Sequence, residues 1–261
     1  MKIISVILFI SGTIFSQDID WVNKTISIDG AGYGKNKLMA KRAAKTDARR
    51  NLIESLKEIR VDSKTTMRDL EIEEDLVVTQ ASGYIKQAWF DDNSIEYERD
   101  NTKWMCSIVI TMPLLGEYSD VVLPKKTNKR FTSELATPEH KQTRTVDPPK
   151  APYTGLVIDL KGKAVMPSMM PKIISEDGAL LYGMSKVSRQ YATNMGVVGY
   201  IKDLNNPQSA TRIGNNPLII TGKDLTGANP CDALISNVDS DLVNSLDNSL
   251  LEQCRVAFLI D

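Results

Sequence analysis

Residues 37–59 read KLMAKRAAKTDARRNLIESLKEI, and apolar side chains recur there at intervals of three or four residues. The recurring positions are Ala40, Ala44, Ala48, Leu52, Leu56 and Ile59. Because about 3.6 residues complete one helical turn, these side chains share one face, while lysines and arginines occupy other faces. The alanines of the first half would let a helix lie close against a sheet. We therefore predict a helix over residues 37–58 that packs on neighbouring strands.

The segment before this helix predicts a strand and a turn. Residues 20–29 carry Trp21, Ile26 and Ile28 in a short, partly alternating pattern. The glycine-rich run 30–34 follows, and we interpret it as a turn because glycine permits positive φ. Its spacing to Lys35 differs from that of phosphate-binding and dinucleotide-binding loops, so we assign it no ligand.

The segment after the helix predicts a second helix and a pair of strands. The second helix is expected within residues 66–82, and strands over 84–90 and 103–114 are separated by a polar loop containing Asp91, Asp92 and Asn93. In the last strand Trp104, Cys106, Ile108, Ile110 and Met112 fall on one face, because strand side chains alternate. Cys106 is therefore expected to be a buried, small apolar side chain.

Residues 1–16 predict an export signal. Lys2 precedes a mostly apolar run over residues 3–15, and Ser16 is a small residue at the expected cleavage point. The run is shorter than the roughly 20 apolar residues of a membrane-spanning helix. An uncleaved anchor is the alternative. No cysteine follows the expected cleavage point, so a lipid anchor is not predicted. We expect a periplasmic protein and leave open whether it associates peripherally with the outer membrane.

Composition and linker signals divide the rest of the chain. Hydrophobic residues make up 42% and charged residues 25%, with a net charge of −1, which is ordinary for a globular protein and does not favour nucleic-acid binding. Periodicity disappears over residues 119–152, which contain a basic cluster and several prolines. We predict an α+β protein with a signal peptide (1–16), an N-terminal helices-on-sheet domain (17–118), a flexible linker (119–152) and a C-terminal α/β domain (153–261).

The C-terminal domain ends in a pattern typical of a strand, a helix and a strand. Short strands are expected within residues 153–159, 179–182, 197–203 and 217–221. Residues 232–235 predict another strand, after which Ser236 and Asp239 form a capping arrangement for a helix with Val238, Leu242, Val243 and Leu246 on its inner face. Residues 255–260 predict a buried closing strand. This order implies a parallel βαβ unit with a right-handed crossover.

The three cysteines are an odd number for an oxidising compartment. Cys231 and Cys254 each precede one strand of the predicted parallel pair, which would place both at the same edge. The sequence favours neither of two alternatives: a disulfide between Cys231 and Cys254, or two free thiols.

The sequence favours a protein that is not an enzyme. Its one histidine, His140, lies in the predicted linker, so no Ser-His-Asp, Cys-His or multi-histidine metal site is expected. Two carboxylate pairs, Asp91 with Asp92 and Glu176 with Asp177, are the nearest candidates for a hydrolase, but adjacent acids in loops usually form turns. We predict no catalytic residues, no cofactor and no metal.

Three segments of the N-terminal half resemble a known family. Residues 43–52 (AAKTDARRNL), residues 59–65 (IRVDSKT) and the strand entering Met112-Pro113-Leu114 are similar to the small domain of a Helicobacter-type outer-membrane lipoprotein and to the N-terminal domain of flagellar assembly protein T. This similarity covers roughly residues 20–118. The segments 153–159, 171–178 and 251–256 resemble a recurring extension of the family in bacterial envelope proteins.

The resemblance implies an accessory protein of the periplasm or outer membrane, acting through contacts with envelope or flagellar proteins. It supplies no catalytic residue. Our leading hypothesis is a structural or assembly protein, with the flagellar basal body as a candidate location and homo-oligomer formation left open. The alternative is an envelope protein that binds a ligand such as wall polymer or a host molecule.

Overall fold

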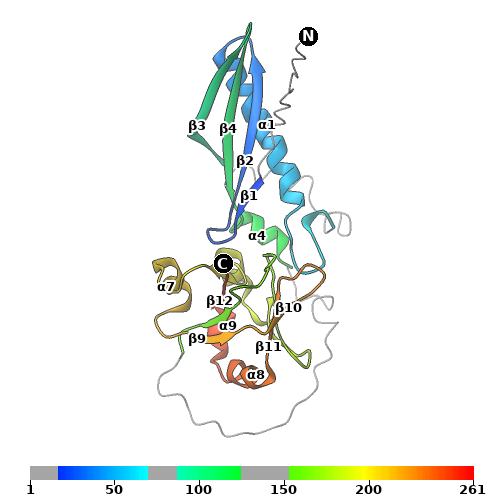
Figure 1. Cartoon of the computed structure of the whole chain (residues 1–261), viewed down its shortest axis with the longest axis vertical. Helices are drawn as coiled ribbons and strands as arrows, with labels where there is room; N and C mark the ends of the chain where they lie inside the picture. The colour runs from blue at the N-terminus through cyan, green and yellow to red at the C-terminus, as the bar shows by residue number, and fades with distance from the viewer. Residues whose placement is uncertain (1–16, 70–86, 125–152) are drawn as a thin grey trace, which may run out of the picture. The chain divides into compact units, whose positions relative to one another are not determined.

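The computed structural model describes residues 17–69, 87–124 and 153–261 (Figure 1). The chain forms two compact units. Among the residues described, the first unit comprises 17–18, 27–52 and 89–111, and the second comprises 19–26, 53–69, 87–88, 112–124 and 153–261. The mixed α+β class predicted from the sequence is confirmed. In these ranges, no helix is long and apolar enough to cross a membrane.

The long helix is confirmed as α1 (Lys37–Lys57). It accompanies a four-stranded sheet with the order β1-β2-β4-β3, formed by β1 (Gln17–Asp20), β2 (Thr25–Gly34), β3 (Trp89–Asp100) and β4 (Lys103–Pro113). The predicted apolar face of α1 is buried: Ala40, Ala44, Ala48 and Leu52 are fully covered. Cys106, Ile108 and Ile110 of β4 are buried as expected, because alternate side chains of this strand face the core.

The glycine-rich run is a strand and not the turn we predicted, because β2 continues to Gly34. A Cβ atom added at Gly30 would lie 2.4 Å from the Cβ of Ala48, one at Gly32 would lie 2.2 Å from the Ala44 nitrogen, and one at Gly34 would lie 2.3 Å from the Ala40 nitrogen. Two strand residues advance about 6.6–6.8 Å and four helical residues about 6.0 Å, so the two series stay in step. The glycines therefore admit the backbone of α1.

The predicted loop at residues 91–93 is also wrong. Asp91, Asp92 and Asn93 belong to β3, whose antiparallel register with β4 shifts between Asp91 and Glu96. A bulge accommodates the polar residues without ending the strand. The chain instead reverses near Asn101, which has a φ of 50°. Residues 70–86 lie outside the described ranges. They include most of the predicted helix over 66–82 and the first part of the predicted strand over 84–90.

The second unit contains two further four-stranded sheets (Figure 1). One is entirely parallel, with the order β8-β12-β5-β9. The other has the order β10-β11-β6-β7, in which only β11 and β6 are parallel. The strands are β5 (Leu156–Asp159), β6 (Ile173–Ser175), β7 (Leu180–Tyr182), β8 (Gly199–Ile201), β9 (Leu218–Thr221), β10 (Asp224–Thr226), β11 (Asp232–Ile235) and β12 (Val256–Leu259).

The second unit also contains short helices. They are α4 (Glu117–Val122), the 3-10 helix η2 (Met184–Lys186), α6 (Arg189–Met195), α7 (Pro207–Ile213), α8 (Asn237–Asn244) and α9 (Asn248–Glu252). Helix α7 packs on the parallel sheet, where Ile213 joins a core with Val157, Ile201, Ala257 and Leu259. Ser236 caps α8 as predicted, but Val238 is exposed and not on the inner face.

The predicted terminal parallel βαβ unit is wrong in its pairing. Strand β11 pairs with β6 and β10, whereas β12 lies between β5 and β8 in the other sheet. All four residues of β12 are buried, which suits a central strand covered on both faces. A continuous apolar run predicts such burial, but it does not specify the neighbouring strands.

The predicted linker starts too early. Residues 117–122 form α4, in which Ser119 and Val122 are buried, and Leu123 is buried after it. Ser119 donates a hydrogen bond from its hydroxyl to the carbonyl of Leu114 at 2.6 Å, which ties the helix to the end of β4. The rest of the predicted linker, from residue 125 to 152, lies outside the described residues, and so does His140.

Candidate functional site

The second unit contains a cavity of about 410 Å³. Its walls come from the turn between β1 and β2, from Leu115, from the ends of α6 and β8, and from α7. Three cationic side chains, Lys24, Lys202 and Arg212, line it together with one acidic side chain, Asp203. We call this space the cationic cavity.

Lys24 is the most unusual residue of the cationic cavity because only 5% of it is exposed. Its φ of 56° places it in the tight turn between β1 and β2, and its carbonyl accepts a hydrogen bond from the Leu114 amide at 2.8 Å. The ammonium lies over two aromatic rings, 4.5 Å from the centroid of Tyr200 and 5.5 Å from that of Trp21. These contacts stabilise a cation, although less than water does.

Arg212 projects from α7 and is held by main-chain carbonyls. Its Nη1 donates to the carbonyls of Cys254 at 2.7 Å and of Gly196 and Val256 at 3.3 Å, and its Nη2 donates to Met195. Met195 and Gly196 end α6, where helical carbonyls carry partial negative charge. Gly199 leaves room for the side chain, because a Cβ there would lie 2.5 Å from Arg212 Cδ.

Tyr200 forms the rigid wall beneath Lys24. Its hydroxyl accepts a hydrogen bond from the Ser168 amide at 2.9 Å and donates one to the Ser168 carbonyl at 3.1 Å. Its ring packs edge-on against Phe258, with centroids 6.1 Å apart, and against Trp21 at 5.8 Å. The aromatic wall is thus anchored in the core of the parallel sheet.

The charges of the cationic cavity are not balanced. No carboxylate forms an ion pair with Lys24 or Arg212 among the residues that the structure describes. Asp203, the acidic residue of the wall, accepts hydrogen bonds from the amide and side chain of Asn205. Burial, followed by the charge of Arg212, holds the pKa of Lys24 well below its ordinary value. An anion in the cavity would reverse this effect.

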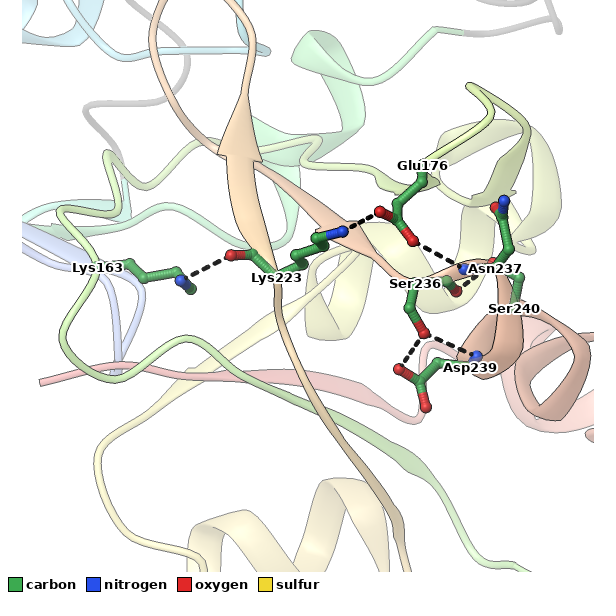
Figure 2. Close-up of polar contacts among 7 residues, drawn as sticks. All are labelled: Lys163, Glu176, Lys223, Ser236, Asn237, Asp239 and Ser240. Carbon is green, nitrogen blue, oxygen red and sulfur yellow. Dashed lines mark hydrogen bonds and ion pairs between the residues drawn. The ribbon is translucent and has the colours of Figure 1, made fainter.

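Glu176, one of the sequence-predicted acids, belongs to a structural cluster (Figure 2). It forms an ion pair with Lys223, and its other oxygen accepts a hydrogen bond from the Asn237 amide at the start of α8, at 3.3 Å. The hydrogen bond from Lys223 lowers the pKa of Glu176. Beside it, the Asp239 amide donates to the Ser236 hydroxyl at 3.1 Å, which completes the predicted cap (Figure 2).

The other candidate acids are engaged in local contacts. Asp177 accepts a hydrogen bond from the Ser175 hydroxyl within the turn between β6 and β7. Asp91 accepts one from the Asn93 amide at 2.9 Å, and Asp92 pairs with Lys41 at 3.2 Å. Neither pair lines the cationic cavity. The structure therefore brings together none of the carboxylates proposed for a hydrolase.

The cysteines are free thiols in the structure, and all three are buried. Our reason for considering a disulfide between Cys231 and Cys254 was wrong, because the strands that follow them lie in different sheets. Burial raises the pKa of Cys231 to about 12 and that of Cys254 to about 11. Within the described ranges, no group of three or more His, Cys, Asp or Glu residues is placed to hold a metal ion.

Sequence reasoning missed the cationic cavity. Lys24 and Arg212 are separated by most of the chain, and neither belongs to a spaced motif. The available signal was weak: Lys24 lies in a short segment that carries Trp21 and Val22 before it and Ile26 after it.

A known family model matches the C-terminal part of the chain. Residues 155–261 match the family model described as Treponema pallidum Tp0624, second domain. The matched segment contains every strand from β5 to β12, which is the part of the second unit that carries Tyr200 and Arg212. No curated protein matches the chain.

Proposed function

We propose that this protein is an exported accessory protein of the bacterial cell envelope, a structural or assembly component that acts through protein–protein contacts. The flagellar basal body is the first location to test. The observation that carries this proposal is a group of exposed apolar side chains at one end of the first unit.

This apolar end consists of Tyr33, Leu38, Met39 and Tyr97. Tyr33 is 56% exposed at the end of β2, and Leu38 and Met39 are 59% and 51% exposed in the first turn of α1. Lys37 Nζ lies 5.2 Å from the Tyr97 ring, so the hairpin of β3 and β4 reaches the same end, as Figure 1 shows. Clustered apolar groups in water are typical of interaction surfaces.

Export is supported by the leader-like composition of residues 1–16. N-terminal sequencing of the protein from the periplasmic fraction tests it, and the expected first residue is Gln17. A protein that keeps Met1 and Lys2 after fractionation would contradict cleavage at this point.

The assembly role is tested by fractionating native cells and following the tagged protein alongside intact basal bodies. We expect enrichment with the basal bodies, and loss of that enrichment in the double variant Leu38→Lys, Met39→Lys. Val238→Lys is the matched control, since Val238 is 76% exposed and belongs to the second unit. Even distribution through the soluble periplasm, with unchanged motility on deletion, would exclude the flagellar location.

A second candidate function is ligand binding in the envelope, and the cationic cavity favours it. Wall polymer is the ligand to test first, through retention of the purified protein on isolated peptidoglycan at low salt. Retention that falls with added salt supports this function, because 0.1 M salt largely screens the attraction between exposed charges that are more than about 10 Å apart. Absence of retention at low salt counts against wall polymer.

A further inference from the structure

We propose that the cationic cavity of the second unit is a binding site for a carboxylate group attached to an apolar body. The site is independent of the apolar end that carries the proposed assembly role, because it consists only of residues of the second unit.

The position of Lys24 carries the proposal. Lys24 is only 5% exposed. A lysine buried to this degree usually has a hydrogen-bonded acid beside it. Here its neighbours are the faces of Tyr200 and Trp21, and in the part of the chain that the structure describes it forms no ion pair. The side chain passes over Gly196, where an added Cβ would lie 3.3 Å from Lys24 Cε and 3.6 Å from Nζ. An anion in the cavity would supply the missing acceptor.

Arg212 contributes charge more than hydrogen bonds. Four carbonyl oxygens already accept from Nη1 and Nη2, so the guanidinium is fixed in place and its positive charge extends into the cavity. Bidentate binding of phosphate or sulfate by Arg needs free, parallel N–H groups. The end-on pair of Nη1 and Nη2 is engaged in this way, so we assign the main hydrogen bond of the ligand to Lys24, and a monoanionic carboxylate suits a single ammonium.

The remaining wall fits the rest of such a ligand. Val22, Leu115 and Ile201 supply apolar surface beside the cations. The volume of about 410 Å³ falls within the range of about 300–1,000 Å³ that small-molecule sites occupy. The carboxylate can therefore belong to a free organic acid or to the C-terminus of a peptide.

Proton uptake distinguishes this site from a simple electrostatic patch. Burial lowers the pKa of Lys24 in the empty site, and a bound carboxylate would raise it again. The other charged or titratable groups that face the cavity are Arg212, Lys202, Asp203 and Tyr200. Burial raises the pKa of Tyr200 far above the working range, so its hydroxyl stays protonated. Carboxylate binding is then expected to draw a proton from the buffer.

The test is calorimetric titration of the full-length mature protein with two carboxylates and their uncharged amides. Hexanoate against hexanamide represents a free acid, and N-acetyl-leucyl-phenylalanine against its C-terminal amide represents a peptide end. We expect the better carboxylate to bind about tenfold or more tightly than its amide, as a charge-assisted hydrogen bond requires. Titration in buffers of different ionisation enthalpy is expected to show proton uptake at pH 8.

Two variants locate the binding. Lys24→Met is expected to weaken carboxylate binding about tenfold and to abolish proton uptake. Lys161→Met, which removes an exposed lysine of the second unit that does not line the cavity, is the matched control and is expected to keep both. Equal binding of acids and amides, undiminished carboxylate binding by Lys24→Met, or no binding of either acid at 10 mM would each overturn the proposal. The acid–amide comparison on the unmodified protein needs no variant to fold.

Discussion

Replacing Gly32 with alanine tests the contact between β2 and α1. The added Cβ would lie 2.2 Å from the Ala44 nitrogen and 2.5 Å from the Ala43 carbonyl carbon, whereas ordinary contacts begin at 3.4 Å. The helix would have to retreat by roughly 1.2 Å, the difference between 3.4 and 2.2 Å, because both blocking atoms belong to its backbone. A gap of about 0.5–1 Å already forfeits a quarter to a half of a van der Waals contact.

The expected loss of stability follows from this displacement. Overpacking costs about 1–3 kcal/mol, and replacing a strand glycine by alanine returns about 0.5–1 kcal/mol of backbone entropy. Because the whole alanine stripe of α1 must move, we expect Gly32→Ala to lower the free energy of unfolding of the first unit by about 2 kcal/mol.

Native-state hydrogen exchange of the amides of residues 37–52 in α1 measures this change in the first unit alone, which matters because a protein of two units need not unfold in one step. Ala31→Ser, on the neighbouring residue of the same strand, is the control and is expected to change stability by less than about 0.5 kcal/mol. Adding Ala44→Gly to Gly32→Ala is not expected to restore stability, since the Ala44 atom in the way is a main-chain nitrogen. Protection of α1 in Gly32→Ala that matches the unmodified protein would refute the reasoning.

Three further predictions concern the second unit. Burial lowers the pKa of Lys24, so the unfolded chain binds more protons than the folded one, and this residue makes stability rise with pH up to its ordinary value of about 10.4. Lys24→Met is therefore expected to raise the free energy of unfolding at pH 7 by on the order of 1 kcal/mol. Urea denaturation at several pH values should show that the free energy of unfolding rises less steeply with pH in this variant. An unchanged dependence on pH would contradict the prediction. Burial raises the pKa of Cys231 to about 12 and that of Cys254 to about 11. A thiol reagent at pH 8 should therefore modify these two cysteines only after urea is added. Rapid modification of the native protein would contradict their burial. Ser236→Ala removes the side-chain acceptor of the Asp239 amide and is expected to cost about 1 kcal/mol in urea denaturation, whereas Ser245→Ala, at the other end of α8, should cost less.

Local patterns predicted much of the fold because the rules behind them are local. The spacing of Ala40, Ala44 and Ala48 identified the buried face of α1, and the alternation from Cys106 to Ile110 identified that of β4. The capping arrangement at Ser236 marked the start of α8, since the cap involves residues three apart. Each of these features depends on neighbours within one element, so periodicity and turn chemistry were sufficient.

The errors arose where one element depends on another. Gly30, Gly32 and Gly34 are compatible with a turn or with a strand, and the approach of α1 selects the strand. The polar residues from Asp91 to Asn93 continue β3 because pairing with β4 tolerates a bulge. Neither outcome is encoded in the segment by itself.

By itself, the sequence determined the α+β class, the long alanine-faced helix and the buried strands, because burial of one face leaves a periodic signature in the residues of that element. Only the tertiary structure decided that β12 lies between β5 and β8, and that Lys24 meets Tyr200 and Arg212 around a cavity. The physical reason is that strand partners and buried charges are set by contacts between residues far apart in the chain. Those contacts place an ammonium group in apolar surroundings, which no local pattern around Lys24 would favour.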